Sequence, residues 1–80
     1  MDQLLDVRSL APPEPLERVL DALATLARGD RLRVLLPREP FPLYDLLRRM
    51  GYRWRTEPAP GRFELLIWPS DTERANGSPA

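Results

Sequence analysis

Proline and glycine divide this chain into short segments. In some segments the apolar residues recur at every second position, as in a strand, and in others at every third or fourth position, as in a helix. Pro15 and Pro42 each stand where a helical pattern begins, because the first turn of a helix tolerates a residue without an N–H group. Gly29 and Gly51 each stand where such a pattern ends, since glycine readily adopts the positive φ found there. The predicted order of elements is strand, helix, strand, helix, strand, strand.

Two helices are expected from apolar residues at helical spacing. The first is predicted to open at Pro15 and to end at Gly29, and the second to open at Pro42 and to end at Gly51. Their apolar stripes consist of Leu16, Val19, Leu20, Leu23, Leu26 and Ala27 in the first, and of Leu43, Leu46, Leu47 and Met50 in the second. Both stripes are interpreted as core, with no cofactor role.

Strands are expected where apolar and polar residues alternate. Gln3–Val7 and Leu32–Leu36 are short candidates, and residues 52–57 and 62–68 form a closing hairpin around Pro58-Ala59-Pro60-Gly61. Charge favours the hairpin register that places Glu57 opposite Arg62, because opposite charges across a pair contribute about 0.2–1 kcal/mol. A slip by two residues would bring Glu57 opposite Glu64, so that register is not expected.

A two-layer α/β sandwich of the α+β class follows from this order. Each strand–helix–strand unit crosses over with the same hand, so the first three strands should be parallel, and the hairpin makes the fourth antiparallel. Both helices then cover one face of a mixed four-stranded sheet. Residues 1–68 are predicted to form a single domain, and residues 69–80, which offer little to bury, a disordered tail.

The composition limits the chemistry that this chain can perform. It contains no cysteine and no histidine, which removes disulfides, thiolate chemistry and the commonest general base and metal ligand. We therefore expect no catalytic residue, no metal site and no cofactor, and we do not expect an enzyme. Twelve arginines balance twelve acidic residues, and this neutral total argues against bulk attraction to nucleic acid or anionic lipid. With no signal peptide and no membrane-length apolar run, a cytoplasmic protein is expected.

The segment from Leu5 to Pro15 runs from a strand into a proline-marked helix start. Its residues Leu5-Asp6-Val7-Arg8 and Pro13-Glu14-Pro15 resemble the opening of the TusA/SirA sulfur-carrier family, in which a strand and Arg-Gly-Leu lead to Cys-Pro-x-Pro. Pro12 stands where that family keeps its reactive cysteine, and Ser9 replaces the usual glycine. The resemblance implies a sheet order of 1-2-4-3, and the missing thiol excludes persulfide transfer by the family's chemistry.

A closer resemblance is to a TusA-like bacterial family of unknown function that lacks the cysteine. The further matching residues are Gly29-Asp30, Arg38-Glu39-Pro40, Pro42-Leu43-Tyr44 and Gly51-Tyr52. This resemblance implies a small non-catalytic module that acts through protein contacts, as an accessory or regulatory component of bacterial metabolism. A divergent component of a sulfur relay is the alternative.

The loops before the two helices supply the first candidate surface, because ligands of such sheets favour the carboxyl ends of the strands. The candidate residues there are Arg8, Pro12, Glu14, Arg38, Glu39 and Tyr44. Two helix N-termini with Arg8 and Arg38 would favour an anion or a carboxylate side chain. Alternatively, Glu14 and Glu39 only stabilise the first turns and the arginines pair with them.

The sheet face that the helices leave open supplies the second candidate surface. It should carry Arg31, Arg33, Arg53, Arg55 and Trp68. Arginine with tryptophan suits single-stranded RNA, another anion or a protein partner, whereas a solvated face covered by arginine stems is the alternative. We expect an unknown protein partner, no nucleic acid, no membrane, and a monomer or weak homodimer.

Overall fold

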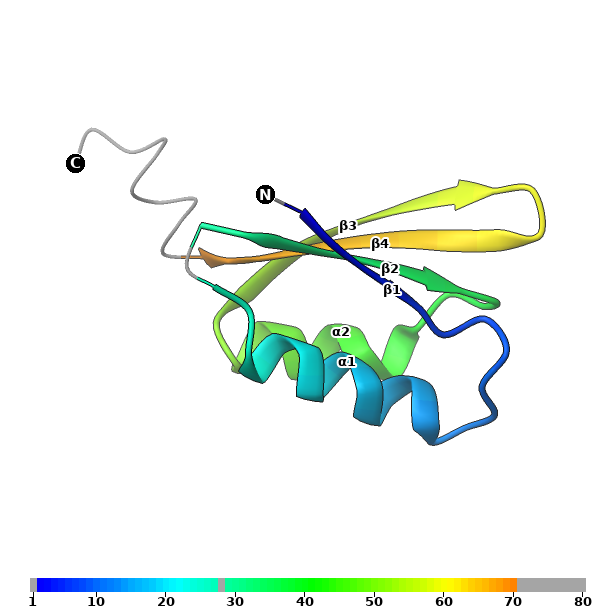
Figure 1. Ribbon diagram of the computed structural model, residues 1–80, viewed down its shortest axis with the longest axis horizontal. Helices are drawn as coiled ribbons and strands as arrows, with labels where there is room; N and C mark the ends of the chain where they lie inside the picture. The colour runs from blue at the N-terminus through cyan, green and yellow to red at the C-terminus, as the bar shows by residue number, and fades with distance from the viewer. Residues whose placement is uncertain (1, 28, 71–80) are drawn as a thin grey trace.

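Within residues 2–27 and 29–70, which the computed structural model describes, four strands form one sheet and two helices lie against one of its faces (Figure 1). In chain order the elements are β1 (Asp2–Asp6), α1 (Glu14–Ala24), β2 (Arg31–Leu36), α2 (Phe41–Arg49), β3 (Tyr52–Ala59) and β4 (Arg62–Pro69). This order confirms the alternation that the sequence predicted. Neither helix is long and apolar enough to cross a membrane.

The strands lie in the order β1-β2-β4-β3. β1 and β2 are parallel, and β4 is antiparallel to both β2 and β3. The predicted two-layer α+β sandwich with a 1-2-4-3 sheet is therefore confirmed. This topology places the carboxyl ends of β1 and β2, and the loops that follow them, at one end of the sheet, next to the starts of both helices (Figure 1).

The core lies between the helices and the covered face of the sheet. Each helix contributes the residues of its stripe that face inward, Val19 and Leu23 from α1 and Leu43 and Leu47 from α2. Alternation along the strands adds Leu32, Val34, Leu36, Leu65 and Ile67, and Val7 follows β1. The helical and strand stripes of the sequence thus meet in one apolar layer, as expected.

The register of the closing hairpin differs from the prediction by two residues. Glu57 lies opposite Glu64, and Ala59 opposite Arg62. The hairpin loop therefore consists of Pro60 and Gly61 alone, and Gly61 has a φ of 71°. Proline followed by a residue with positive φ is the pattern of a type II turn. Turn chemistry thus outweighs the charge pairing that favoured Arg62 as the partner of Glu57.

The like charges brought together by this register are compensated elsewhere in the sheet. The carboxylate of Glu64 lies 3.1 Å from Arg33 of β2 and 3.0 Å from Arg62 of its own strand. A two-residue slip also keeps every side chain on the same face of the sheet, because the strand period is two. The error in register consequently left the prediction of the core unchanged.

The predicted end of the first helix is wrong by several residues. α1 ends at Ala24, and the hydroxyl of the next residue, Thr25, donates to the backbone oxygen of Ala22 at 3.3 Å. Such local bonding from threonine competes with helix continuation. Gly29, with a φ of 91°, serves instead in a separate turn in which the N–H of Asp30 donates to Ala27.

The end of α2 agrees with the prediction, except for one side chain. Gly51 follows the helix with a φ of 86°, as expected of its terminating residue. Met50 was predicted on the apolar stripe, but it is the C-cap residue and is 47% exposed. It therefore contributes little to the core.

Two boundaries shift by one residue. β1 covers Asp2–Asp6 instead of residues 3–7, and Val7 still donates from its N–H to Leu35 at 3.0 Å. Pro69 was assigned to the tail, yet it is the last residue of β4, and Ser70 hydrogen-bonds to the backbone oxygen of Gly51. The rest of the predicted tail, residues 71–80, lies outside the described residues.

Candidate functional site

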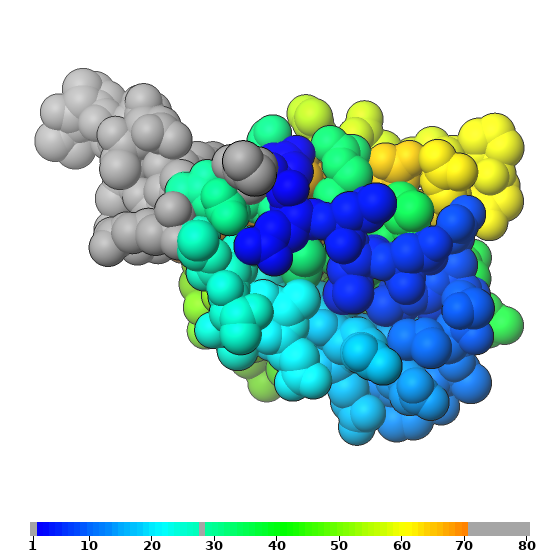
Figure 2. Space-filling model, viewed as in Figure 1, coloured from blue at the N-terminus to red at the C-terminus, as the bar shows by residue number. Residues whose placement is uncertain are grey.

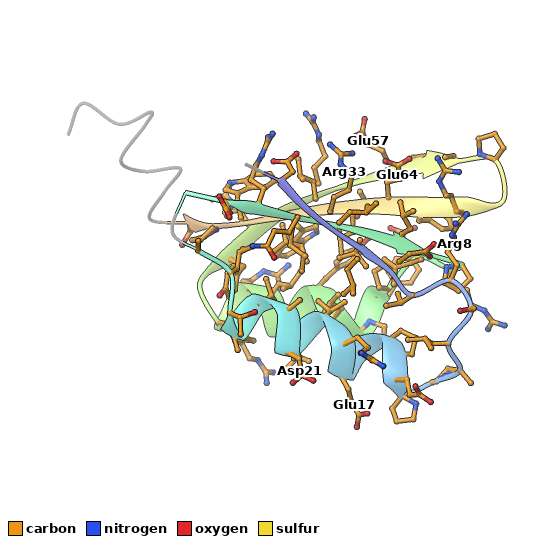
Figure 3. All side chains as sticks on the ribbon, viewed as in Figure 1. Arg8, Glu17, Asp21, Arg33, Glu57 and Glu64 are labelled. Atoms are coloured by element: carbon orange, nitrogen blue, oxygen red, sulfur yellow. The ribbon has the colours of Figure 1, made fainter. Side chains whose placement is uncertain are left out.

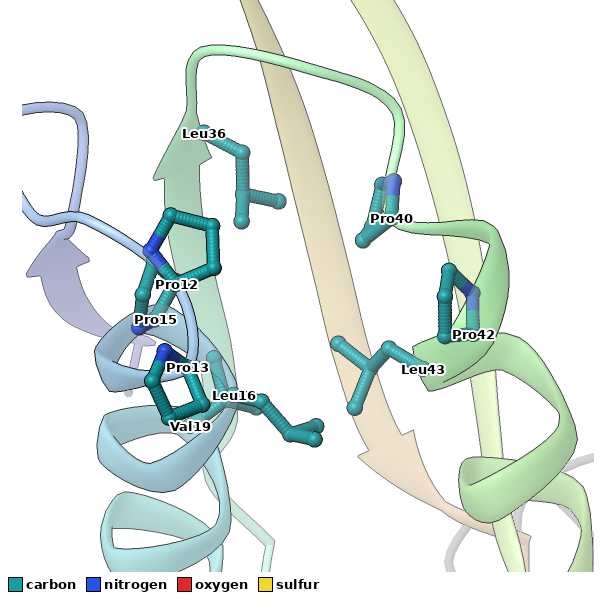
Figure 4. Close-up of a pocket in the computed structure, with 9 residues that line it drawn as sticks. All are labelled: Pro12, Pro13, Pro15, Leu16, Val19, Leu36, Pro40, Pro42 and Leu43. Carbon is teal, nitrogen blue, oxygen red and sulfur yellow. The ribbon is translucent and has the colours of Figure 1, made fainter.

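The starts of α1 and α2 face each other across the end of β2 and enclose a pocket of about 290 Å³ (Figure 4). We call it the proline groove, and it is lined by Pro12, Pro13, Pro15, Leu16, Val19, Leu36, Pro40, Pro42 and Leu43. Its walls are the proline rings that precede and open each helix, and Leu36 of β2 lies between them (Figure 4). Every lining side chain is apolar.

A second hollow of about 490 Å³ adjoins the groove and shares Pro12, Pro15, Leu36 and Pro40 with it. We call it the polar hollow. Besides the shared residues it is lined by Arg8, Leu10, Ala11, Pro37, Arg38 and Glu39. Figure 2 shows the loop between β1 and α1, which supplies one side of it, on the surface at the same end of the molecule as the β3–β4 turn. The two hollows together form a continuous site at the loop edge predicted from the sequence.

The start of α1 offers few free N–H groups to a ligand, although helix N-termini usually bind anions. The N–H of Glu14 donates to Ala11 at 3.0 Å, and that of Glu17 donates to Pro13 at 3.2 Å. Pro13 and Pro15 have no N–H at all. Most of the donors on which an anion site would depend are therefore absent or engaged.

The start of α2 repeats this arrangement. The N–H of Phe41 donates to Glu39 at 3.1 Å, that of Leu43 donates to Pro40 at 3.0 Å, and Pro42 has none. The groove between the two helix starts is thus poor in hydrogen-bond donors. Its chemistry suits an apolar group rather than a phosphate or a sulfate.

Arg8 is held by an acidic residue that was not among the predicted site residues. Its Nε lies 2.9 Å from Asp6 Oδ1, its Nη2 lies 2.8 Å from Oδ2, and its backbone N–H also donates to Asp6 at 3.1 Å. These hydrogen bonds, from the side chain first and the backbone second, lower the pKa of Asp6 from 3.8 to about 2. Both side chains are half-exposed. Arg8 therefore reaches the polar hollow as one member of an ion pair.

Arg38 differs from Arg8 in having no partner among the residues that the structure describes. Its side chain is exposed on the wall of the polar hollow, and it makes no ion pair or hydrogen bond within residues 2–27 and 29–70. The neighbouring Glu39 is engaged, because its Oε2 accepts a hydrogen bond of 3.1 Å from the hydroxyl of Tyr44. Of these two adjacent charges, Arg38 is the one with no partner among the described residues, whereas one oxygen of Glu39 is held by Tyr44.

Two predicted residues do not line the hollows. Glu14 is exposed in the first turn of α1. Tyr44 turns toward β3, where its hydroxyl bonds Thr56 and its ring stacks on Trp54 at 5.2 Å with planes 7° apart. Burial raises the pKa of Tyr44 above its usual 10.0. The structure therefore unites Arg8, Pro12, Arg38 and Glu39 and assigns Tyr44 to the packing of α2 on the sheet.

Acidic partners surround several arginines of the open sheet face. Arg31 lies 2.9 Å from Asp2, and Arg33 lies 3.1 Å from Glu64. Hydrogen bonds from Arg31 lower the pKa of Asp2, and hydrogen bonds from Arg62 and then Arg33 lower the pKa of Glu64. Figure 3 shows Arg33 and Glu64 projecting together on the side away from the helices.

Leu66 shows that this face is covered as well as charge-balanced. It lies in β4 opposite Arg55 on one side and Arg33 on the other, yet it is only 7% exposed. Arginine stems that lie over an apolar residue bury it in this way. Arg53 and Trp68 are opposite each other, and neither is without an interaction partner. These features agree with the solvated alternative for this face.

Sequence reasoning did not find the proline groove or the role of Asp6. The groove depends on how closely two helix starts approach, which no local pattern gives, although matching prolines at both starts hinted at a shared feature. Asp6 could have been found, because an aspartate side chain commonly accepts a hydrogen bond from the backbone N–H two residues later, as Asp6 does from Arg8. Among the described residues, no three His, Cys, Asp or Glu side chains gather in a way that could hold a metal.

Comparison with known proteins adds a family but no named function. No curated protein and no solved structure matches this chain. One family model does match, that of an uncharacterised conserved protein family, DUF2249, and its match over residues 4–69 includes every element from the end of β1 to the end of β4. The chain therefore belongs to the DUF2249 family.

Proposed function

We propose that this chain is a non-catalytic protein-interaction module of the TusA/SirA-like type, and that its working surface is the proline groove. The observation that carries the proposal is a pocket at the two helix starts whose lining residues are all apolar and whose walls are poor in free N–H groups. Pro12, which takes the position of the carrier cysteine in the resemblance, lines this pocket. The module keeps the surface of a sulfur carrier and uses it for contact.

The residues near the groove support contact rather than catalysis. Ser9 is the hydroxyl residue of the β1–α1 loop, and a serine without an adjacent base is a poor nucleophile. Tyr44 and Glu39 are hydrogen-bonded to each other. We therefore assign the chain an accessory or regulatory place in bacterial metabolism, in the cytoplasm, and no reaction of its own.

The size of the groove indicates what kind of group it receives. Ligand pockets span about 300–1,000 Å³, and the groove, at about 290 Å³, lies just below that range. It suits one or two side chains of a partner better than a cofactor. Apolar side chains seated in such pockets dominate the energetics of protein interfaces.

A photo-crosslinking amino acid at Pro42, on the exposed wall of the groove, tests the proposal in cells. The matched control places the same amino acid at Glu57, which is exposed on the open face. We expect a discrete adduct from position 42, whose partner is identified by mass spectrometry and then binds the purified wild-type chain. Adducts from position 57 alone would move the working surface to the open face.

The alternative role in a sulfur relay has its own readout. Incubation of the purified chain with a persulfide donor, followed by intact-mass spectrometry, should give no sulfur adduct, because the chain has no thiol. A stable mass increase of one sulfur atom would contradict the non-catalytic assignment.

A further inference from the structure

Resting on the proposed function, the geometry points to one class of occupant for the proline groove. We infer that it receives a linear segment of a partner protein in which a large apolar side chain is flanked by aspartate or glutamate. The apolar side chain would enter the groove, and the carboxylate would meet Arg38 in the polar hollow. Each half of this inference rests on a separate observation.

The apolar half follows from the lack of hydrogen-bond donors in the groove. Because the N–H groups of Phe41 and Leu43 are engaged by Glu39 and Pro40, and Pro42 has none, the start of α2 offers few donors to a peptide backbone. The apolar lining of the groove therefore favours a partner that binds through a side chain. Proline rings are rigid, and a preformed pocket loses little entropy when it is filled. A leucine or phenylalanine side chain meets these conditions.

The carboxylate half follows from the charges that line the polar hollow. Arg8 is neutralised by its double hydrogen bond to Asp6, and Glu39 accepts from Tyr44. Arg38 is the charged group of the hollow that lacks a partner among the described residues. A carboxylate next to the apolar anchor would pair with it, whereas a lysine or arginine there would be repelled by Arg38.

The two halves should differ in strength. Truncating a seated apolar anchor typically costs at least ~2 kcal/mol, which corresponds to about a 30-fold loss of affinity. An exposed ion pair contributes up to ~1 kcal/mol, or about fivefold. The apolar anchor therefore provides the affinity, and Arg38 provides the preference for acidic neighbours.

A panel of fluorescein-labelled peptides tests this inference by fluorescence anisotropy with the purified full chain. The reference peptide is a Gly/Ser-rich decapeptide with a central Phe between two Asp. The other members replace both Asp by Asn, both Asp by Lys, or Phe by Ser. We expect the Asn peptide to bind about two- to fivefold more weakly, the Lys peptide more weakly still, and the Ser peptide about 30-fold more weakly.

Two variants of the chain locate the effect. Arg38→Glu should reverse the order of the Asp and Lys peptides, and Arg55→Glu, the matched change on the open face, should leave it unchanged. Pro12→Asp, which places a charge at the junction of the two hollows, should abolish binding of all peptides. Circular dichroism verifies that each variant is folded.

The outcomes separate this inference from the proposed function. Equal binding of the Asp, Asn and Lys peptides, with no effect of Arg38→Glu, would overturn the acidic preference. Failure of all four peptides to bind would overturn the whole inference. Neither result would change the outcome of cross-linking from position 42. That experiment tests the proposed function and does not depend on the sequence of the partner.

Discussion

The open sheet face and the polar hollow beside the proline groove both carry arginine, but Arg31 and Arg33 of the first differ from Arg38 of the second in their partners. On the open face, Arg31 and Arg33 pair with Asp2 and Glu64 of neighbouring strands. At the groove, Arg38 has no partner within the described residues and stands beside an apolar pocket. Counting arginines along the sequence does not distinguish the two surfaces. What distinguishes Arg38 from Arg31 and Arg33 is that it has no carboxylate partner among the described residues and that an apolar cavity lies beside it.

The two helix starts also differ from what their sequence pattern alone would suggest. A helix N-terminus attracts anions through its free N–H groups and its dipole. Here the prolines that open both helices remove N–H groups, and loop carbonyls accept those of Glu14 and Phe41. The two helix starts, for which the sequence left an anion site as one of two interpretations, instead border an apolar pocket. Proline at a helix start thus stabilises the helix and also changes what its end can bind.

The largest expected effect tests whether the open face is sealed. Replacing Leu66, which is 7% exposed on that face, by alanine should lower the free energy of unfolding by about 2–3 kcal/mol, because a buried leucine lost to alanine costs ~2–5 kcal/mol. Urea denaturation followed by circular dichroism measures it. The control is Leu4→Ala on the same face, where the side chain is 66% exposed and the change should stay within about 0.5 kcal/mol. Equal losses for both would mean that the arginine stems do not cover Leu66.

A smaller effect tests the assignment of Tyr44 to packing. Tyr44→Phe removes the hydroxyl that bonds Glu39 and Thr56 and should cost about 0.5–1.5 kcal/mol of unfolding free energy. A double-mutant cycle with Thr56→Val isolates the bond to Thr56. Binding of the Asn peptide should be unchanged, since Tyr44 lines neither hollow and that peptide has no carboxylate for a released Glu39 to repel. A loss of binding at unchanged stability would return Tyr44 to the functional site.

A smaller effect again concerns acid pH and the carboxylates of both surfaces. The folded-state pKa of Asp6 is lowered from 3.8 to about 2, and those of Asp2 and Glu64 are lowered as well, in each case through hydrogen bonds from arginine. In this range the unfolded chain binds more protons than the folded chain, so stability is present above the unfolded pKa and is lost as pH falls toward 2. Thermal unfolding between pH 5 and pH 2 measures this slope.

Added salt and single substitutions can show how much each surface contributes to the loss of stability at acid pH. All three carboxylates are accessible to solvent, so 1 M salt should flatten the slope. Asp6→Asn should reduce it near the groove, and Glu64→Gln should reduce it on the open face. A slope that neither salt nor these variants change would show that acid sensitivity arises elsewhere in the chain.

The fold could be predicted from this sequence because the errors in the prediction did not exchange the buried and exposed faces of any helix or strand. The hairpin register was wrong by two residues, and that slip left Leu65 and Ile67 in the core. Pro60-Gly61 carried the correct information, but the charges of Glu57 and Arg62 were given more weight. A two-residue turn with positive φ at its second position constrains the backbone more strongly than an exposed charge pair does.

The site could be predicted only in part. The loop edge with Pro12 and Arg38 was found, since the topology brings the ends of β1 and β2 together. Which charge is free depends on side-chain geometry across the loops, such as the hydrogen bond between Tyr44 and Glu39. The groove itself depends on the distance between two helices, which periodicity does not contain.

The smallest expected effect is that of single-stranded RNA on the tryptophan fluorescence of the chain, because we expect no RNA to bind the open face. Trp68 lies on that face opposite Arg53, so stacking of a base on its ring would alter tryptophan fluorescence. Binding to RNA gains much of its strength by releasing counterions from phosphates, and it therefore weakens steeply with salt. Because Arg31 and Arg33 are already paired with Asp2 and Glu64, few phosphates could be neutralised. Titration with a homopolymeric single-stranded RNA at low salt should give no salt-sensitive quenching. Titrating Asp2→Asn/Glu64→Gln in parallel makes this result informative, since quenching that arises only in that variant would show that the carboxylates keep the arginines from RNA.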